Sequence, residues 1–380
     1  MPSDTKFLNA RARPTVVATS DLLVHATNVT GLGARHVVES LLLALARDDQ
    51  LNGATVFLPD DAIALDDLLL HAGATVMRRR RLLPHSVSRM LECLLPQRAY
   101  TRHAAALVLG DVPLRGVRNQ VVLVHQPHLL SPAVSGFASA GFKYDVMRSV
   151  FRRNLGDAAA IIVQSDAMRD QLARSYPDVS GRIAVIPQPA PHWFTSPEQR
   201  RPRNESGRLK LLYPAAGYPH KNHKLLALMN GHRTGAPDVE IVITLAGDRS
   251  RDHDTYGAWV VNVGRLDWPQ LVTTYAEVDA LFFPSLLESY GLPLVEGMMA
   301  GLPIVCADLP YAHWLCGAQA IYFDPRNAAS AWAAISELKR RVESGWSPDW
   351  GSALAKLPRD WDEVARSFLA VVHALDKPTA

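Results

Sequence analysis

The sequence predicts an α/β protein with two domains, each a doubly wound parallel sheet, that face each other across a cleft. Short apolar runs rich in β-branched residues alternate with longer amphipathic stretches along the 380 residues. This alternation is typical of strands buried on both faces of a parallel sheet and of the helices that cover them. It stops once, in a segment rich in Pro, Ser and charge at 187–208, and then restarts. A chain of this length is also long enough for two or three domains.

The part of the chain before this segment predicts the first domain, which we place at residues 1–195. Amphipathic stretches at 34–48 and 166–176 are expected to form helices. The expected strands are "PTVVATS" (14–20), "ATVFLP" (54–59), "AALVLG" (105–110), "QVVLVH" (120–125), "AIIVQS" (160–165) and "IAVIPQ" (183–188).

The second domain is placed at residues 196–358, and a long amphipathic helix is expected in the remaining residues, 359–380. In such sheets, ligands bind outside the carboxyl ends of the strands, so we expect a binding site at the cleft. The expected strands are "LKLLYPA" (209–215), "VEIVITLAG" (239–247), "AWVVNVG" (258–264), "DALFFPS" (279–285), "LPIVCAD" (302–308) and "AIYFDP" (320–325).

The composition argues against several classes of protein. Forty basic and thirty-seven acidic residues give a net charge of +3, too small to indicate a nucleic-acid partner. The three cysteines are scattered without a CxxC pair, so neither a disulfide framework nor a zinc site is indicated. No apolar run reaches the roughly 18 residues that a membrane-spanning helix needs. The first thirteen residues hold no apolar signal core, and we expect a cytoplasmic protein.

The stretch "FFPSLLESYGLPLVEGMMAGLPIVCADLP" (282–310) carries the strongest chemical signal. A strand is expected to end at Pro284, and Pro293 is favoured at the start of the helix that follows. Gly291 would let the backbone approach a ligand closely. The amides around Gly291, Leu292 and Leu294 would form a helix N-terminus that favours an anion such as a diphosphate.

Two glutamates flank this turn, Glu288 on the loop and Glu296 in the first turn of the helix. A carboxylate accepts hydrogen bonds well from paired hydroxyls, such as those of a ribose or a sugar ring. The alternative is that both glutamates stabilise a helix start and face water, which is common for glutamate at such positions. The full pattern of strand, loop and helix is more specific than the pair of glutamates alone.

This stretch resembles the signature of retaining glycosyltransferases with the GT-B fold, family 4 (the glycosyltransferase group 1 type). The resemblance covers the second domain well and the first loosely. It implies two Rossmann-like domains, and a last helix that crosses back to the first domain. It also implies a GDP- or UDP-linked sugar as donor, no cofactor and no required metal. The matching residues are Pro284, Ser285, Glu288, Tyr290, Gly291, Leu292, Pro293, Glu296, Gly297, Met298, Gly301 and Pro303.

The resemblance also assigns roles within this stretch. Glu288 would contact the hydroxyls of the donor sugar, and Glu296 would bind the ribose. The amides near Gly291 and Leu292 would bind the diphosphate, and Tyr290 belongs to the same donor-binding turn.

A second donor contact is expected in "YPAAGYPHKNHKLL" (213–226), where a glycine turn, Lys221 and a following helix suit a phosphate site. The family usually has an arginine six residues before this lysine, and here that position is Ala215. Lys221 would then carry the diphosphate charge alone or with another base such as Arg265. A solvated lysine and a solvated loop arginine are the alternatives.

The first domain contributes fewer candidates. His125 ends the strand "QVVLVH" and resembles the family's strand-end histidine that faces the donor sugar, although Gln126 replaces the usual aspartate. Gly31 and Gly33 precede a helix where the family has a glycine pair beside the donor phosphate or the acceptor. A structural histidine and a plain helix-start turn are the alternatives.

Residues 77–103 hold seven arginines and one glutamate, and apolar residues recur at helical spacing. A basic amphipathic segment suits an anionic membrane surface or a lipid-pyrophosphate acceptor. The alternative is a helix packed on the core with a solvated charged face. The apolar positions are Val87, Met90, Leu91, Leu94 and Leu95.

The sequence thus predicts an enzyme that transfers a hexose from a nucleotide sugar to an acceptor hydroxyl with retention, in polysaccharide or glycolipid assembly of the O-antigen or exopolysaccharide type. The expected partners are the nucleotide sugar and a glycan or lipid-linked acceptor. A nucleotide-sugar epimerase, a phosphorolytic enzyme and an inactive sugar-nucleotide-binding protein remain as alternatives. The missing arginine at Ala215 keeps the last one open.

Overall fold

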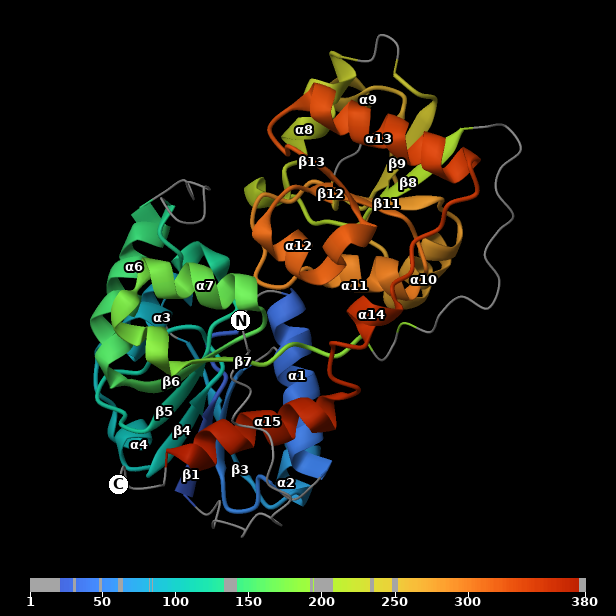
Figure 1. The fold of residues 1–380 in the computed structure, drawn as a ribbon. Coiled ribbons are helices and arrows are strands. Elements are labelled where there is room, and N and C mark those ends of the chain that lie inside the picture. Colours follow the sequence, from blue (N-terminus) through green and yellow to red (C-terminus); the bar gives the residue numbers. More distant parts are fainter. Residues whose placement is uncertain are drawn as a thin grey trace, which may run out of the picture.

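The structure is a computed structural model, and it contains two parallel sheets with helices on both faces (Figure 1). One sheet has seven strands and comes from the first half of the chain, and the other has six strands from the second half. The structure describes residues 21–29, 32–47, 50–60, 64–81, 83, 85–132, 142–191, 194, 208–232, 236–247 and 252–375.

The N-terminal sheet has the strand order β3-β2-β1-β4-β5-β6-β7. All its strands are parallel, and the order reverses between β1 and β4, which makes the carboxyl ends of these two strands a switch point. The strands are β1 (Leu22–His25), β2 (Thr55–Pro59), β3 (Thr75–Arg79), β4 (Ala105–Val108), β5 (Gln120–Leu123), β6 (Ala158–Val163) and β7 (Ile183–Val185).

Two apolar layers cover this sheet, because successive side chains of a strand point to opposite faces. Val121 and Leu123 pack under α1, α2 and α15, whereas Val122 and Val124 pack under α3, α6 and α7. The helices of this half are α1 (Leu32–Arg47), α2 (Asp66–His71), α3 (His85–Leu94), α4 (Arg98–Thr101), η2 (Pro127–Leu129), α6 (Phe142–Asn154), η3 (Leu155–Asp157), α7 (Asp166–Ser175) and η4 (Pro177–Arg182).

The C-terminal sheet repeats the same winding, with the order β10-β9-β8-β11-β12-β13. Its strands are also parallel, and the order reverses between β8 and β11. The strands are β8 (Leu209–Tyr213), β9 (Val239–Ile243), β10 (Val260–Asn262), β11 (Ala280–Phe283), β12 (Ile304–Ala307) and β13 (Ile321–Phe323). The helices are η5 (Pro219–Lys221), α8 (Lys224–Asn230), α9 (Asp252–Tyr256), α10 (Trp268–Ala276), α11 (Leu292–Met299), α12 (Pro310–Cys316), η6 (Gly317–Gln319), α13 (Ala328–Glu343) and α14 (Gly351–Leu354).

The last helix, α15 (Trp361–Ala374), returns to the N-terminal half and packs beside α1 (Figure 1). Trp361, Phe368 and Val372 are buried in the same apolar cluster as the residues of α1. Asp360 caps the helix by accepting a hydrogen bond from the Glu363 amide at 2.8 Å. The N-terminal half is therefore built from both ends of the described chain.

Several side chains join the two halves. The Tyr290 hydroxyl donates to the Gln188 carbonyl oxygen at 2.6 Å, and the Ser165 hydroxyl donates to the Ser289 carbonyl oxygen at 2.9 Å. Leu287, which follows β11, is buried in the apolar cluster under α3, α6 and α7 of the N-terminal half. The loop after β11 therefore lies at the interface of the two halves.

The fold class predicted from the sequence is confirmed, but the structure corrects some of its elements. The strand expected at 14–20 lies outside the described residues. β1, at 22–25, was not predicted; it begins two residues after that segment. β3 was missed because it is an edge strand, half-exposed, and carries Arg78 and Arg79. The boundary placed after residue 195 also lies outside the described residues, so it stays a prediction.

The basic segment 77–103 is not one amphipathic helix. Its first residues belong to β3, a helix begins at His85, and the short α4 follows. On α3 the apolar stripe is largely turned outward: Val87 and Leu91 are exposed, and so is Leu95 directly after the helix. None of the described helices is long and apolar enough to span a membrane.

Candidate functional site

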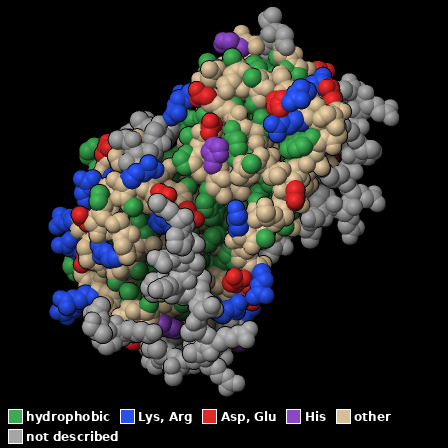
Figure 2. Space-filling model, in the orientation of Figure 1, with side chains coloured by type: hydrophobic (Ala, Val, Ile, Leu, Met, Phe, Trp, Pro, Cys, Tyr) green, Lys and Arg blue, Asp and Glu red, His purple; other side chains and the backbone are tan. Residues whose placement is uncertain are grey.

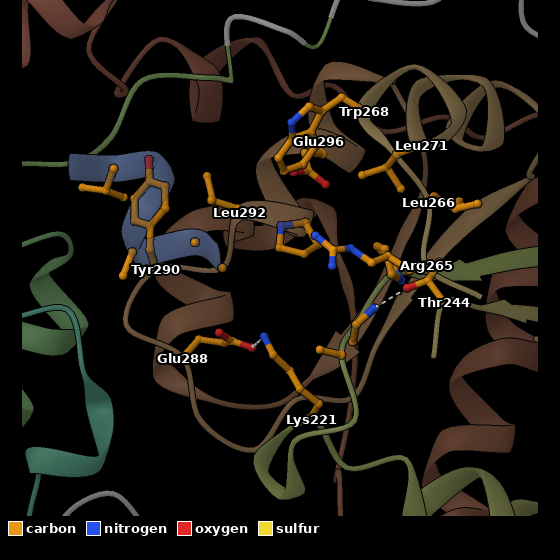
Figure 3. A pocket seen from close by; sticks show the side chains of 18 of the residues that line it. Lys221, Thr244, Arg265, Leu266, Trp268, Leu271, Glu288, Tyr290, Leu292 and Glu296 are labelled. Carbon is orange, nitrogen blue, oxygen red and sulfur yellow. Dashed lines mark hydrogen bonds and ion pairs between the residues drawn. The ribbon is translucent and has the colours of Figure 1, made fainter. Parts of the chain in front are cut away.

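A cavity of about 1010 Å³ lies where the carboxyl ends of the C-terminal strands face the N-terminal half (Figure 3). Most of its wall comes from loops that follow β8, β9, β10 and β11, and the N-terminal half adds α1 and the ends of β5 and β6. Nine of the ten candidate residues predicted from the sequence line this cavity. They are Gly33, His125, Lys221, Arg265, Glu288, Tyr290, Gly291, Leu292 and Glu296.

Lys221 and Glu288 meet because β8 and β11 are neighbours in the sheet, at its switch point. The turn with Lys221 follows β8, and the loop with Glu288 follows β11. Asn222 fixes these two segments together, since its side-chain amide donates to the carbonyl oxygens of Pro284 at 3.1 Å and Pro325 at 2.7 Å. Asn222 has a φ of 63°, a left-handed conformation that asparagine tolerates better than most residues.

The Lys221 ammonium donates to Glu288 Oε1 at 2.5 Å, and the two side chains are 16% and 12% exposed. The same ammonium lies 5.5 Å from the centre of the Phe283 ring. This pair is partly shielded from water but open to the cavity. It therefore presents a cation and a hydrogen-bond acceptor side by side to a ligand.

The helix α11 begins beside this pair. Gly291 is its N-cap and has a φ of 105°, a backbone conformation that other residues rarely adopt. The amide of Leu294 donates to the Gly291 carbonyl oxygen at 2.9 Å, so it is not available to an anion as the sequence predicted. Pro293 has no amide hydrogen. The amides of Gly291 and Leu292 remain the candidates for an anion at this helix start.

Glu296 lies deeper in the same wall and is buried. The Tyr275 hydroxyl donates to its Oε2 at 2.7 Å. Burial raises the pKa of Glu296 to about 7, although the hydrogen bond from Tyr275 and the charge of Lys221 act in the opposite direction. At neutral pH the carboxyl group is therefore close to half-protonated. Its protonated form can donate a hydrogen bond, and its ionised form can only accept.

Ala215 is buried and lines the cavity at the position where the resemblance leads one to expect an arginine. Its amide donates to the Thr244 hydroxyl at 3.1 Å, and both residues line the cavity. Arg265, from the loop after β10, lines the same cavity and extends its side chain into it, across from Lys221 and Glu288 (Figure 3). The cavity therefore holds an arginine, but from a different loop.

His125 follows β5 on the N-terminal side of the cavity. Asp111 lies beside it: Asp111 Oδ1 accepts a hydrogen bond from the His125 backbone amide at 2.9 Å and lies 3.6 Å from Nδ1, which makes no hydrogen bond to the described residues. Asp111 is buried and has a φ of 68°. Asp111 was not predicted from the sequence, although an aspartate directly after "VLG" and a strand is a recognisable signal.

Of the remaining predicted residues, Gly33 and Tyr290 line the cavity, whereas Gly31 is not among the described residues. Gly33 lies in the first turn of α1 rather than before the helix, and a Cβ added to it would meet no atom within 4 Å, so this position opens into free space. Tyr290 lines the cavity, but its hydroxyl is occupied by Gln188 and its ring packs against Trp314 at 5.9 Å between ring centres.

Trp268 was also missed in the sequence. It begins α10, is 50% exposed and lines the cavity, and its ring centre lies 6.2 Å from that of His36 on α1. An exposed tryptophan directly after the "VGRLD" loop is the signal that could have found it.

Comparison with known proteins gives a consistent result. Residues 209–340 match the family described as "Glycosyl transferases group 1". The O-antigen chain mannosyltransferase RfbU of Salmonella typhimurium is 23% identical over 238 residues, which cover 60% of this chain and 63% of that protein. The O-antigen chain mannosyltransferase B of Escherichia coli is 24% identical over 255 residues, covering 58% and 64%. The matches thus span just under two thirds of the length of these relatives.

Solved structures resemble nearly the whole chain. Sucrose-phosphate synthase of Thermosynechococcus elongatus has a TM-score of 0.64 and 16% identity, covering 93% of this chain and 96% of that one. HepE of Anabaena, in complex with UDP and glucose, has a TM-score of 0.58 and 15% identity, covering 93% and 98%. The chain therefore has the two-domain GT-B fold, with a region similar to group 1 glycosyl transferases in its C-terminal half.

Proposed function

We propose that this protein is a retaining glycosyltransferase that moves a hexose from a nucleotide sugar to a hydroxyl of a glycan or lipid-linked acceptor. The observation that carries the proposal is the Lys221–Glu288 pair at 2.5 Å, beside the start of α11 and inside the cavity between the two halves. The match of 209–340 to group 1 glycosyl transferases supports it. The two O-antigen mannosyltransferases among the relatives support a role in surface polysaccharide assembly.

The donor would bind along the C-terminal wall. Lys221, together with the amides of Gly291 and Leu292, would hold the diphosphate, and Arg265 supplies a second cation in place of the arginine missing at Ala215. Glu296 would accept hydrogen bonds from the ribose hydroxyls. A diphosphate held by fixed cations and amides is stabilised as it departs, which lowers the barrier to transfer.

The sugar would lie between Glu288 and His125, each on one side of the cavity. Both would orient it by hydrogen bonds to its hydroxyls. In retention, the acceptor hydroxyl attacks the anomeric carbon from the face that the diphosphate leaves. A diphosphate oxygen would accept the acceptor proton, because none of the described side chains that line the cavity is placed as an obvious base.

The first test of this proposal is binding and stereochemistry with the full chain. A thermal-shift series with UDP, GDP, ADP and their sugars identifies the nucleotide, because a ligand that binds only the folded state raises the melting temperature. Proton NMR of the product, with a panel of glycan and lipid-linked acceptors, then reports the anomeric configuration. An inverted product contradicts the retaining mechanism. Tight nucleotide binding without transfer to any acceptor would instead favour a binding protein.

A further inference from the structure

The helix α3 packs on the N-terminal sheet with a glutamate facing inward and apolar side chains facing outward. Glu92 faces inward and is buried, whereas Val87 and Leu91 are exposed. A carboxylate is normally placed outside and apolar side chains inside, because burying a charge costs free energy unless the charge is paired. A departure of this kind from the usual pattern is expected at a functional site.

The inward carboxylate of Glu92 is fully paired, which fixes the orientation of α3. Its Oε1 accepts a hydrogen bond from the Thr27 hydroxyl at 3.0 Å and one from Tyr100, and it lies 3.1 Å from His25 Nε2. The Arg81 guanidinium donates to its Oε2 at 3.3 Å. The apolar stripe of α3 is therefore held on the surface by contacts on the opposite face of the helix.

Val87, Met90 and Cys93 of α3 form one wall of a groove, and α6 forms the other. The groove has a volume of about 540 Å³, within the range of about 300–1,000 Å³ that small-molecule sites occupy. At its edge Phe142, the first residue of α6, is 83% exposed. The apolar residues that line the groove are Val87, Met90, Cys93, Val112, Phe142, Val146, Met147 and Val150.

Two cations, Arg89 and Lys143, line the same groove. Lys143 is exposed, and the buried Arg89 Nε has no hydrogen-bond partner among the described residues. Figure 2 shows further Lys and Arg side chains along the left edge of the molecule, where Figure 1 places α4 and α6. An apolar groove with cations on its wall is complementary to an amphiphile that has an apolar chain and an anionic head.

The groove is connected to the donor cavity through one buried carboxylate. Arg89 Nη2 donates to Asp111 Oδ2 at 3.3 Å, and Asp111 Oδ1 accepts from the His125 amide at 2.9 Å. His125 lines the donor cavity, and Arg89 lines the groove. Arg89 in the groove and His125 in the donor cavity are therefore linked through a single carboxylate.

We infer that the groove between α3 and α6 binds the apolar chain of an anionic lipid phosphate, with the phosphate against Arg89 and Lys143. The assignment of this lipid as the acceptor rests on the proposed function, but the binding itself does not.

The experiment measures binding of farnesyl diphosphate, a water-soluble lipid diphosphate, to the full chain by titration calorimetry. Two further probes each lack one half of the molecule: inorganic diphosphate lacks the chain, and farnesol lacks the charge. We expect farnesyl diphosphate to bind at least about tenfold more tightly than either, because both the chain and the charge contribute. Equal affinity for inorganic diphosphate would overturn the inference.

Variants then locate the site. Val87→Ser with Phe142→Ser reduces the apolar wall, and Lys143→Glu reverses a charge; each is expected to weaken farnesyl diphosphate binding about tenfold. Leu70→Ser, on the exposed face of α2, is the matched control and should not weaken it. All these side chains are exposed, so thermal melting should change little.

The donor cavity is the competing place for a diphosphate, and Lys221→Ala separates the two. We expect this variant to keep its affinity for farnesyl diphosphate and to lose affinity for the nucleotide. Loss of farnesyl diphosphate binding in Lys221→Ala, or unchanged binding in the groove variants, would overturn the inference. If the chain binds farnesyl diphosphate in the groove but transfers no sugar, the proposed function fails and the groove assignment stands.

Discussion

Each half of the molecule carries one buried or half-buried carboxylate contact that joins residues 67 positions apart, and the two contacts differ in what they leave open. In the C-terminal half Lys221 and Glu288 meet at the switch point between β8 and β11, and both line the large cavity. In the N-terminal half His25, the last residue of β1, contacts Glu92 of α3. His25 is fully buried, and Glu92 is 8% exposed.

The two sheets are wound in the same way, but the carboxylate contacts at their switch points have different roles. The C-terminal pair remains accessible to a ligand, so its charges are available for binding. The N-terminal pair is sealed, so its charges hold a helix in place and turn an apolar face outward. A carboxylate at a switch point therefore indicates a ligand site only if it also lines a cavity, and the predictions below test this distinction.

The largest expected effect is on the sealed contact. Burial alone raises the pKa of Glu92, but the hydrogen bonds and charge of His25, the hydrogen bond from Tyr100 and the charge of Arg81 outweigh it and lower that pKa to about 2. Removing one partner of a buried pair leaves the other charge uncompensated. Glu92→Gln should therefore lower the free energy of unfolding of the N-terminal half by about 3–5 kcal/mol.

Urea denaturation at pH 7 measures this loss, and Glu343→Gln is the matched control. Glu343 lies 3.9 Å from Lys339 on the surface of α13, where an ion pair contributes at most about 1 kcal/mol. Because Glu92 has a lowered pKa, its contribution is present above its unfolded-state pKa near 4.5 and is lost as the pH falls toward 2. Equal stability losses in the two variants would contradict a structural role for the sealed contact.

The second prediction concerns the open pair. Glu288→Gln keeps the size of the side chain but removes the charge beside Lys221, so the hydrogen bonds that orient the sugar weaken in the transition state. We expect kcat to fall by about 10²–10³-fold, the range for losing one fixed electrostatic contact. The melting temperature should change little, because the pair is open to the cavity.

Steady-state transfer rates with the nucleotide sugar found by thermal shift measure the effect. Glu277→Gln, an exposed glutamate at the end of α10, is the matched control and should retain full activity. Undiminished transfer by a well-folded Glu288→Gln variant would exclude Glu288 from the reaction.

The difference between the two halves also explains why the C-terminal site residues could be predicted from the sequence and the buried contact of the N-terminal half could not. Lys221, Glu288 and Glu296 were predicted because they lie in segments that follow predicted strands and that resemble the glycosyltransferase signature. In parallel sheets the carboxyl ends of neighbouring strands meet at one edge. A ligand site at this edge could therefore be expected from the predicted strands, before their order in the sheet was known.

The N-terminal site could not be found in this way. Glu92 is the one acidic residue in a segment of seven arginines, and such a residue normally marks a solvated helix face. Its burial follows from contacts with residues of β1, β3 and α4 that no local pattern specifies. β3 itself lacked an apolar alternation, because an edge strand is half-exposed and tolerates arginine.

A third prediction uses the pKa of Glu296, which burial raises to about 7. If the carboxylate accepts from both ribose hydroxyls, nucleotide affinity should rise by about tenfold between pH 6 and pH 8 as the group ionises. Stability should change in the opposite direction. Between pH 4.5 and about 7 the folded state keeps a proton that the unfolded state loses, so the contribution of Glu296 to stability falls as the pH rises.

Titration calorimetry across this pH range tests the third prediction, with Glu296→Gln as the comparison. The glutamine variant cannot ionise, so its affinity should lack the part of the pH dependence that Glu296 contributes. An identical pH profile in the two proteins would show that another group governs nucleotide binding.

The smallest expected effect concerns the contact between the two halves. The Tyr290 hydroxyl donates to the Gln188 carbonyl oxygen at 2.6 Å, and this contact joins the donor-binding turn to the segment that follows β7. Tyr290→Phe removes only the hydroxyl and should cost about 0.5–1.5 kcal/mol of stability. Tyr218→Phe, whose side chain is 57% exposed, is the control and should cost less than about 0.5 kcal/mol.

If Tyr290 binds the donor directly, its variant should lose nucleotide affinity without losing stability, whereas an interface role predicts a stability loss and little change in affinity. The outcome decides whether the aromatic residue of this motif belongs to the open site or to the framework that supports it.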